Sequence, residues 1–190
     1  MSFAHIVSAR GGGPCVLRSS SRIMQSAGMR TTMTVFAALA AALALLTVSA
    51  SADKDKAGFV RVTPEEVVWT DRPGYDGVKF AVIQGDPTKP GIYVVRAKFS
   101  PGTMTRPHWH PEDRYVIVVQ GTWYTGEGDT FDPDKTQPLK AGSFMLHPAK
   151  AHHYDGAKDE EVIVQIIGIG PSNTTLIHPE QGNTGRSKPR

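Results

Sequence analysis

The stretch Gly102–Gly121 reads GTMTRPHWHPEDRYVIVVQG and holds two histidines, His108 and His110, separated by one residue. On a β-strand this spacing places both imidazoles on one face, about 6.6 Å apart along the chain, where both can lean toward one ion. The following run, Tyr115–Val119, is apolar throughout, as expected of a strand covered on both faces. The stretch therefore predicts a buried strand next to two candidate metal ligands.

A second stretch, 142–157, reads GSFMLHPAKAHHYDGA and adds three histidines. His152 and His153 are neighbours, so on a strand they face opposite ways, and we expect His152 at the surface. His147 precedes a proline and suits either a satisfied core position or a polar place in a ligand pocket. Tyr154 and Asp155 suit a structural role at the end of the strand.

The two stretches resemble the two sequence motifs of the cupin superfamily. The first motif has the order Gly, His-x-His, Glu, Gly, and the second has the order Gly, Pro-x-Gly, His, Asn. The glycine, proline and histidine anchors stand in register here, except that one glycine is Lys150, and the final asparagine is Ala157. The short segments HWHP, GTWY and AGSF resemble those of small exported bacterial cupins of unassigned function. The resemblance implies an all-β fold, a double-stranded β-barrel of the jelly-roll type, in a single domain over residues 57–170.

The resemblance also implies a metal site whose ligands are His108, His110 and His153. The usual fourth ligand, a glutamate, falls at Arg114, and a guanidinium has no lone pair to give to a metal. Three accounts stay open. The site is a three-histidine centre with free positions for iron, manganese, nickel, copper or zinc; or Glu112, which shares strand parity with the two histidines, supplies the carboxylate; or the metal is lost and the barrel binds small molecules alone.

Arg114 would add positive charge next to a positive ion, which is unfavourable unless an anion compensates. Glu112 is the internal candidate for that anion, and a bound carboxylate substrate is the external one. The alternative is that Arg114 has no functional role, lies at the barrel rim and extends into water. We therefore take Arg114 and Glu112 as candidate catalytic residues, and His147 and Tyr154 as candidate substrate-binding residues.

Helical periodicity is nearly absent after residue 57, and short β-rich runs recur between turn residues. The expected strands are Glu66–Thr70, Val78–Gln84, Ile92–Phe99, Tyr115–Gln120, Thr122–Tyr124, Ser143–His147 and Glu161–Gly168. Residues 171–190 are polar, and we expect them to form a frayed tail.

The charge of the chain is uneven. The sequence pI is about 9.0, but residues 1–52 contain four arginines and no acidic residue. Without that segment, 17 basic side chains face 18 acidic ones, a formal charge of −1. A nucleic-acid partner thereby loses its main support. The one cysteine, Cys15, lies in the same segment, so residues 57–170 can form neither a disulfide nor a cysteine metal site.

Two functions compete. The first is a metalloenzyme of oxygenase, lyase or isomerase type that acts on a small molecule, and the alternative is a non-catalytic barrel that binds a metal or small ligand. A closed four-ligand site favours the second, and an open coordination position favours the first. The expected partner is a small-molecule ligand, with a carboxylate and a homodimer as options.

The N-terminal segment predicts export. The run Thr34–Val48, TVFAALAAALALLTV, has the length of a signal-peptide core and is short for a membrane span. Arg30 precedes it, and small residues follow at 48–52. We take 29–52 as the signal peptide and 1–28 as a possible over-extended start, with a transit peptide as the rival interpretation. The mature protein would be periplasmic or secreted and would keep no membrane span.

We predict cleavage after Ala50 or Ala52, because these positions offer the small side chains that signal peptidase requires. N-terminal sequencing of the mature protein measures the cleavage site. A full-length cytoplasmic product that begins at Met1 would contradict the prediction.

Overall fold

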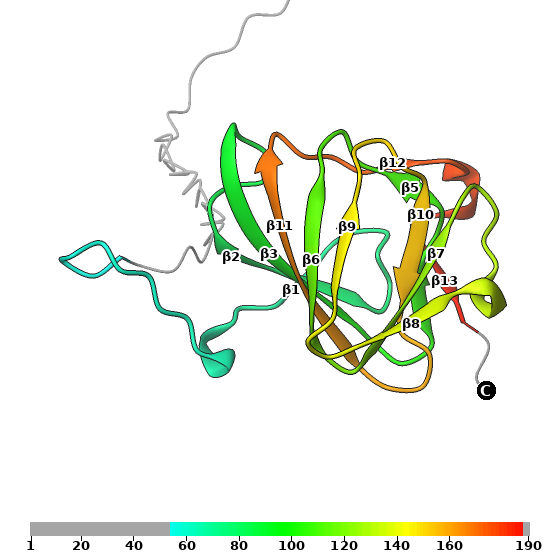
Figure 1. The fold of residues 1–190 in the computed structure, drawn as a ribbon, viewed down its shortest axis with the longest axis horizontal. Coiled ribbons are helices and arrows are strands. Elements are labelled where there is room, and N and C mark those ends of the chain that lie inside the picture. Colours follow the sequence, from blue (N-terminus) through cyan, green and yellow to red (C-terminus); the bar gives the residue numbers. More distant parts are fainter. Residues whose placement is uncertain (1–53, 188–190) are drawn as a thin grey trace, which may run out of the picture. The chain divides into compact units, whose positions relative to one another are not determined.

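The β-rich runs of the sequence form two antiparallel sheets that enclose one interior (Figure 1). A computed structural model of the chain describes residues 54–187. The predicted signal peptide (29–52) and the proposed over-extended start (1–28) lie outside the described residues. Within the described part, no helix is long and apolar enough to cross a membrane.

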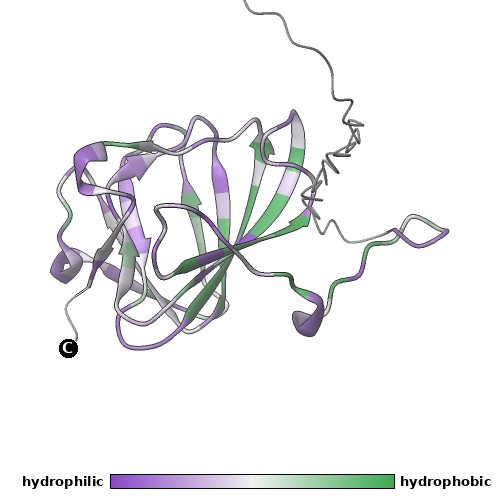
Figure 2. Ribbon diagram, turned by 180° about the vertical axis from the view of Figure 1, so that it is seen from behind, coloured by the Kyte–Doolittle hydropathy of each residue, from purple (hydrophilic) through white to green (hydrophobic). Residues whose placement is uncertain are grey.

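The first sheet has six strands in the order β1-β2-β3-β11-β6-β9. They are β1 (Thr70–Asp71), β2 (Val78–Gln84), β3 (Gly91–Phe99), β11 (Val162–Gly170), β6 (Arg114–Gln120) and β9 (Phe144–His147). Its centre is the β3–β11 pair, whose register runs over nine residues from Val162↔Phe99 to Gly170↔Gly91. Hydrophobic colouring is densest along this sheet (Figure 2).

The second sheet has seven shorter strands. Its main path is β12 (Thr175–Leu176), β5 (His108–Trp109), β10 (His153–Gly156), β4 (Thr103–Thr105) and β13 (Thr184–Arg186), while β7 (Thr122–Glu127) pairs with β10 and with β8 (Gln137–Lys140). Residues 54–187 include three short 3₁₀ helices: Pro64–Glu66 precedes β1, and Pro133–Lys135 and Pro179–Gln181 lie between strands. The expected all-β double-stranded barrel is thus confirmed.

The barrel interior is a core to which both sheets contribute. Val116 of β6, Val164 of β11 and Trp123 of β7 are each 1% exposed and belong to one cluster. Burying a valine side chain contributes about 1.5–3 kcal/mol, so the packed β-branched residues hold the two sheets together. This core supports the strands that carry the histidines of the two motifs.

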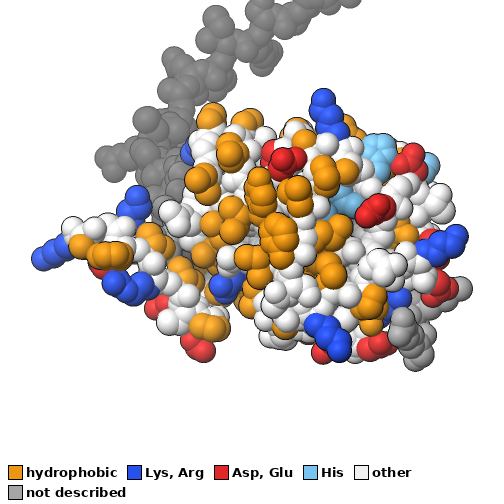
Figure 3. Space-filling model, in the orientation of Figure 1, with side chains coloured by type: hydrophobic (Ala, Val, Ile, Leu, Met, Phe, Trp, Pro, Cys, Tyr) orange, Lys and Arg blue, Asp and Glu red, His pale blue; other side chains and the backbone are white. Residues whose placement is uncertain are grey.

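The apolar run of β6 is buried on one face only, which differs from the expectation. Val116 and Val118 point inward, whereas Tyr115, Ile117 and Val119 are 36–45% exposed. Phe144 and Leu146 of β9 continue the exposed apolar surface, which is visible across the front of the molecule (Figure 3). Residues that alternate on a strand point to opposite faces, and here the outer face is apolar as well.

Two expectations about element boundaries are wrong. A strand over Glu66–Thr70 does not form: a 3₁₀ helix occupies Pro64–Glu66, and pairing with β2 begins only at Thr70. Residues 171–187 are not a frayed tail, because β12 pairs with β5 and β13 pairs with β4. These strands are two and three residues long, and their role is to pair backbone groups of the sheet. Strands this short leave no hydrophobic pattern in the sequence.

Lys150 occupies the position where the cupin motif has glycine, and its backbone φ is 64°. This is the left-handed region, which is unfavourable for residues that carry a Cβ. The conformation serves a tight turn in which the Ala151 amide donates to the Pro148 carbonyl and the Lys150 amide donates to the His110 carbonyl. The turn therefore connects the second motif to the first.

Lys150→Gly should raise the free energy of unfolding by about 0.5–1 kcal/mol, because relief of the left-handed strain exceeds the added entropy of the unfolded chain. Chemical denaturation of the metal-free protein measures the change. Lys150→Ala removes the same side chain but keeps Cβ, so it should give no such gain. Equal stability of the glycine and alanine variants would contradict the prediction.

Candidate metal centre

A cavity of about 490 Å³ lies inside the barrel and is lined by residues of both sheets. Its apolar wall includes Val95, Val116 and Val164 of the six-stranded sheet. Against this wall stands a group of polar side chains: His108, His110, Arg114, His147, His153 and Asp155. The arrangement has the size and the mixed lining of a small-molecule site.

Strand register brings the histidines together. In the β5–β10 pair, His153 stands directly opposite His108, and residues opposite each other on antiparallel strands project to the same side. His110 lies just after β5, two residues beyond His108, and its ring lies beside the other two, as the His-x-His spacing predicts. The ring centroids are 4.4 Å apart for His108 and His153, 4.8 Å for His108 and His110, and 5.3 Å for His110 and His153.

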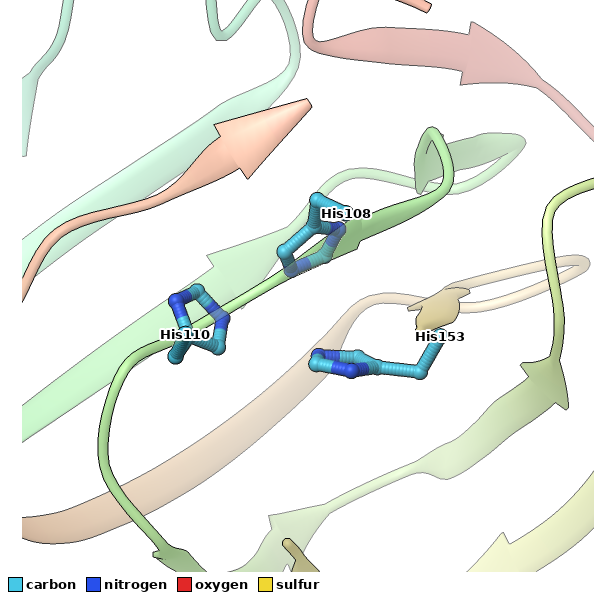
Figure 4. A group of neighbouring side chains, drawn as sticks. All are labelled: His108, His110 and His153. Carbon is cyan, nitrogen blue, oxygen red and sulfur yellow. The ribbon is translucent and has the colours of Figure 1, made fainter. Parts of the chain in front are cut away.

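The three rings are turned toward one another (Figure 4). One ligand atom from each lies within 4.8 Å of the other two. We call His108, His110 and His153 the triad site. Its members are those that the cupin motifs imply.

Backbone carbonyls fix which nitrogen of each ring is available. The Nδ1 atom of His108 lies 2.7 Å from the Arg106 carbonyl oxygen, and that of His153 lies 2.9 Å from the Ala151 carbonyl oxygen. The Nδ1 atom of His110 lies 2.7 Å from the Asn173 carbonyl oxygen. A carbonyl only accepts, so each Nδ1 carries the hydrogen and each Nε2 carries the lone pair.

The same imidazoles are neutral at neutral pH. Burial, followed by the neighbouring His153, lowers the pKa of His108 to about 3, and burial lowers the pKa of His153 to about 4. Burial and the Arg114 charge also hold the pKa of His110 far below its ordinary value. Neutral imidazoles are the ligand form that divalent transition metals require, so His108 and His153 each offer an Nε2 lone pair that such a metal can bind.

Arg114, at the position of the missing glutamate, is held inside the barrel rather than at its rim. Its side chain is 15% exposed. Its Nε donates to Glu112 Oε1 at 3.0 Å and its Nη2 donates to the Ser172 hydroxyl. Its Nη1 lies 2.9 Å from His110 Nε2, which must accept because His110 Nδ1 already donates. Arg114 therefore occupies the lone pair that His110 would offer to a metal.

Glu112 turns inward, but its carboxylate serves Arg114 rather than the histidines. Its Oε1 also accepts the Tyr93 hydroxyl at 2.6 Å. Burial by itself raises the pKa of Glu112, yet the hydroxyls of Ser172 and Tyr93 and the Arg114 guanidinium outweigh it, so the net pKa lies below the ordinary value. Glu112 is therefore the internal anion that balances Arg114.

Two residues beside the triad extend the cluster. His147 is 5% exposed, lines the cavity, and its Nε2 has no hydrogen-bond partner among the described residues. Asp155 accepts the Trp123 indole N–H on Oδ1 at 3.3 Å. Burial raises the pKa of Asp155 to about 7.

The sequence suits a structural role for Asp155, but its spacing from His153 also indicates a place in the cavity. Asp155 follows His153 by two residues on β10, which is the same spacing that joins His108 to His110. Residues two apart on a strand share a face, so Asp155 points into the interior with His153. Ser172 and Asn173, which contact Arg114 and His110, carried no such signal.

Tyr154 does not stand where a ligand-binding residue is needed. It packs with Met104 and Phe131 in a second core cluster, and its hydroxyl donates to the Asp132 carbonyl oxygen. Strand parity explains this, because Tyr154 lies between His153 and Asp155 and points the other way. His152 is at the surface as expected, 2.5 Å from an Asp129 carboxylate oxygen.

Glu112→Gln should lower the free energy of unfolding by about 2–4 kcal/mol, because it leaves the Arg114 charge buried without a counter-ion. The double variant with Arg114→Met should recover most of the loss. The pKa of Glu112 is depressed, so its stabilising contribution is present above its unfolded pKa and is lost as the pH falls through the folded pKa. The wild-type advantage should therefore shrink below about pH 4.

Urea denaturation between pH 3 and pH 7 measures both effects. Glu160→Gln, at an exposed position, is the matched control and should leave stability nearly unchanged. A Glu112→Gln protein as stable as the control at pH 7 would show that the ion pair is not holding this part of the barrel.

Comparisons with known proteins agree with the geometry. Germin-like protein subfamily 3 member 2 of Arabidopsis thaliana is 27% identical over 84 residues, which span 44% of this chain and 37% of the plant protein. The polyketide cyclase RemF of Streptomyces resistomycificus has a TM-score of 0.50 at 16% identity, over 62% of this chain and 86% of that one. A putative ethanolamine utilization protein of Salmonella typhimurium has a TM-score of 0.50 at 15% identity, over 64% and 94%.

At these identities the two structures support the fold alone, and the chain spans little more than a third of the plant relative. A family model described as the ChrR cupin-like domain matches residues 57–173, which is more than half of the chain. Together with the barrel topology and the histidines of both motifs, this match confirms the expected superfamily: the chain belongs to the cupins, in the family of ChrR cupin-like domains.

Proposed function

We propose that this protein is a metal-dependent enzyme that converts a small molecule bound in the barrel cavity. The observation that carries the proposal is a cluster of buried histidines and one aspartate at the wall of a cavity of about 490 Å³, which forms two groups that could each hold an ion and that share His153. The rings of His108, His110 and His153 are each oriented by a backbone carbonyl, an arrangement that is typical of metal ligands. The metal would be iron, manganese, nickel, copper or zinc.

The donor set supports an enzyme rather than a structural metal site. Either group supplies three protein ligands and so leaves coordination positions free, and Arg114 cannot close the site because it offers only hydrogen-bond donors. A bound divalent metal would supply a Lewis acid or an oxygen-activating centre. Oxygenase, lyase and isomerase reactions all remain candidates, because the likeness to RemF and other cupins is one of fold.

The chain's own groups give the cavity its other properties. Val95, Val116 and Val164 exclude water from one wall, which strengthens electrostatic interactions inside. The Glu112 carboxylate neutralises Arg114, so a carboxylate substrate is not needed to balance that charge. Arg114 holds the His110 ring at Nε2 and the Asn173 carbonyl holds it at Nδ1, so a metal bound by His110 would have to displace Arg114 from Nε2.

One observation favours the alternative, a barrel that binds a ligand without catalysis. His110 Nε2 accepts from Arg114, so the network at this ring is satisfied with no ion present. Under this alternative, the cavity would bind an uncharged or weakly polar small molecule against its apolar wall.

Two further proposals concern the surroundings of the protein. Export to the periplasm or the medium is supported by the apolar run Thr34–Val48. A homodimer is supported by the apolar outer face of β6 and β9, since exposed apolar patches often mark protein interfaces.

His153→Ala should remove the bound metal, with affinity falling more than about a hundredfold, because the loss of one imidazole leaves too few donors. The protein is purified without a histidine tag, and elemental analysis with equilibrium dialysis gives metal content and affinity. His152→Ala, one residue away and at the surface, is the matched control and should keep one equivalent.

Metal retained in His153→Ala would refute the proposed centre. A wild-type protein that binds no divalent metal would favour the metal-free binding barrel instead.

A further inference from the structure

The histidine cluster contains a second set of ligands next to the triad site. His147, His153 and Asp155 each place one ligand atom within 4.8 Å of the other two, and all three residues are buried. The ring centroids of His147 and His153 are 3.8 Å apart and their planes differ by 39°, so the two rings pack partly face to face. We call His147, His153 and Asp155 the Asp155 site.

The ligand atoms of the Asp155 site lie at separations that one cation can bridge. His153 Nε2 has no hydrogen, because Nδ1 donates to the Ala151 carbonyl. It faces Asp155 Oδ2 at 4.0 Å, which is too far for a hydrogen bond but short enough for both atoms to bind one ion at about 2.0–2.2 Å each. His147 Nε2 is buried and has no hydrogen-bond partner among the described residues, so it is available as the third ligand atom.

Arg114 disfavours an ion at the triad site for two reasons. Its Nη1 already holds the only lone pair of His110, at 2.9 Å. Its positive charge would also stand next to the ion, where the three triad ligands bring no negative charge. The Asp155 site has a carboxylate among its ligands and makes no use of His110.

We propose that the metal ion of this protein occupies the Asp155 site, bound by His147, His153 and Asp155, because Arg114 has taken His110 out of the ligand set. The inference rests on the proposed function in assuming that the chain binds a metal. Two histidines and one carboxylate form a donor set that suits iron(II) and related divalent metals and leaves positions free for other ligands. Since His153 has one lone pair and belongs to both sites, these two sites hold one ion between them and not two.

The proposal gives His147 and Asp155 a direct role and reduces that of His110. Trp123 keeps Oδ1 of Asp155 occupied, which leaves Oδ2 toward His153. In β6 and β9, Arg114 stands directly opposite His147, so both are anchored in the same strand pair and hold their positions relative to each other.

The test measures Co²⁺ affinity of the full-length chain and its variants by competition with a chelator, together with the visible spectrum of the bound Co²⁺. Asp155→Asn and His147→Phe should each weaken Co²⁺ binding by about tenfold or more, and His110→Ala should weaken it by less than about threefold. Asp155→Asn keeps the acceptor for Trp123, which favours correct folding. His152→Ala is the control and should bind as the wild type does.

Arg114→Met gives a second measurement, which does not require the Asp155→Asn and His147→Phe variants to fold correctly. With the guanidinium gone, His110 regains its lone pair, so His110→Ala should weaken Co²⁺ binding more in the Arg114→Met background than in the wild type. The visible spectrum should also change between wild type and Arg114→Met as a nitrogen ligand is added.

A larger loss of affinity from His110→Ala than from either His147→Phe or Asp155→Asn would overturn the proposal and assign the ion to the triad site, while the proposed metal-dependent function would stand. If wild-type protein binds no Co²⁺, the proposed function fails and this inference fails with it. The two failures are therefore distinguishable in one set of measurements.

Discussion

The site depends on the register of two short antiparallel strand pairs. His153 stands opposite His108 in the β5–β10 pair, and Arg114 stands opposite His147 in the β6–β9 pair. A shift of one residue in either register would turn these side chains to the other face. The apolar core between the sheets, and the turn at Lys150 that binds the His110 carbonyl, oppose such a shift. The chemistry of the cavity is thus set by backbone pairing before any ligand is considered.

The exchange of a carboxylate for a guanidinium at position 114 has a large electrostatic consequence. An ion bonded to His110 Nε2 at about 2.1 Å would lie no more than about 5 Å from Arg114 Nη1, given the 2.9 Å contact. At an effective dielectric constant of about 20, a divalent ion and a guanidinium at that distance repel by about 7 kcal/mol before Glu112 offsets part of it. Glu112 is bonded to Arg114 and is not among the residues grouped around either site. Charge therefore favours an ion that lies nearer to Asp155.

Much of the fold could be predicted because long strands with apolar faces leave a clear pattern. Val78–Gln84 forms β2 with the bounds expected from the sequence. The two-residue strand β12 leaves no such pattern, and neither does β13, because their role is to pair backbone groups. In the site, the motifs implied His108, His110 and His153. The structural role expected of Tyr154 agrees with its core packing, whereas its candidate role in substrate binding does not, and strand parity from His153 indicates that Asp155 faces the cavity.

The C-terminal strands explain why a segment without hydrophobic patterning matters to the cavity. Leu176 of β12 pairs with His108, so this short strand closes the open edge of β5. Just before β12, the Asn173 carbonyl accepts from His110 Nδ1 and the Ser172 hydroxyl accepts from Arg114. The tautomer of His110 and the orientation of Arg114 thus both depend on residues 172–173. The Asn173 contact is made by a backbone carbonyl, so many side chains could stand at position 173. The site requires instead that the segment after β11 runs back to pair with β5.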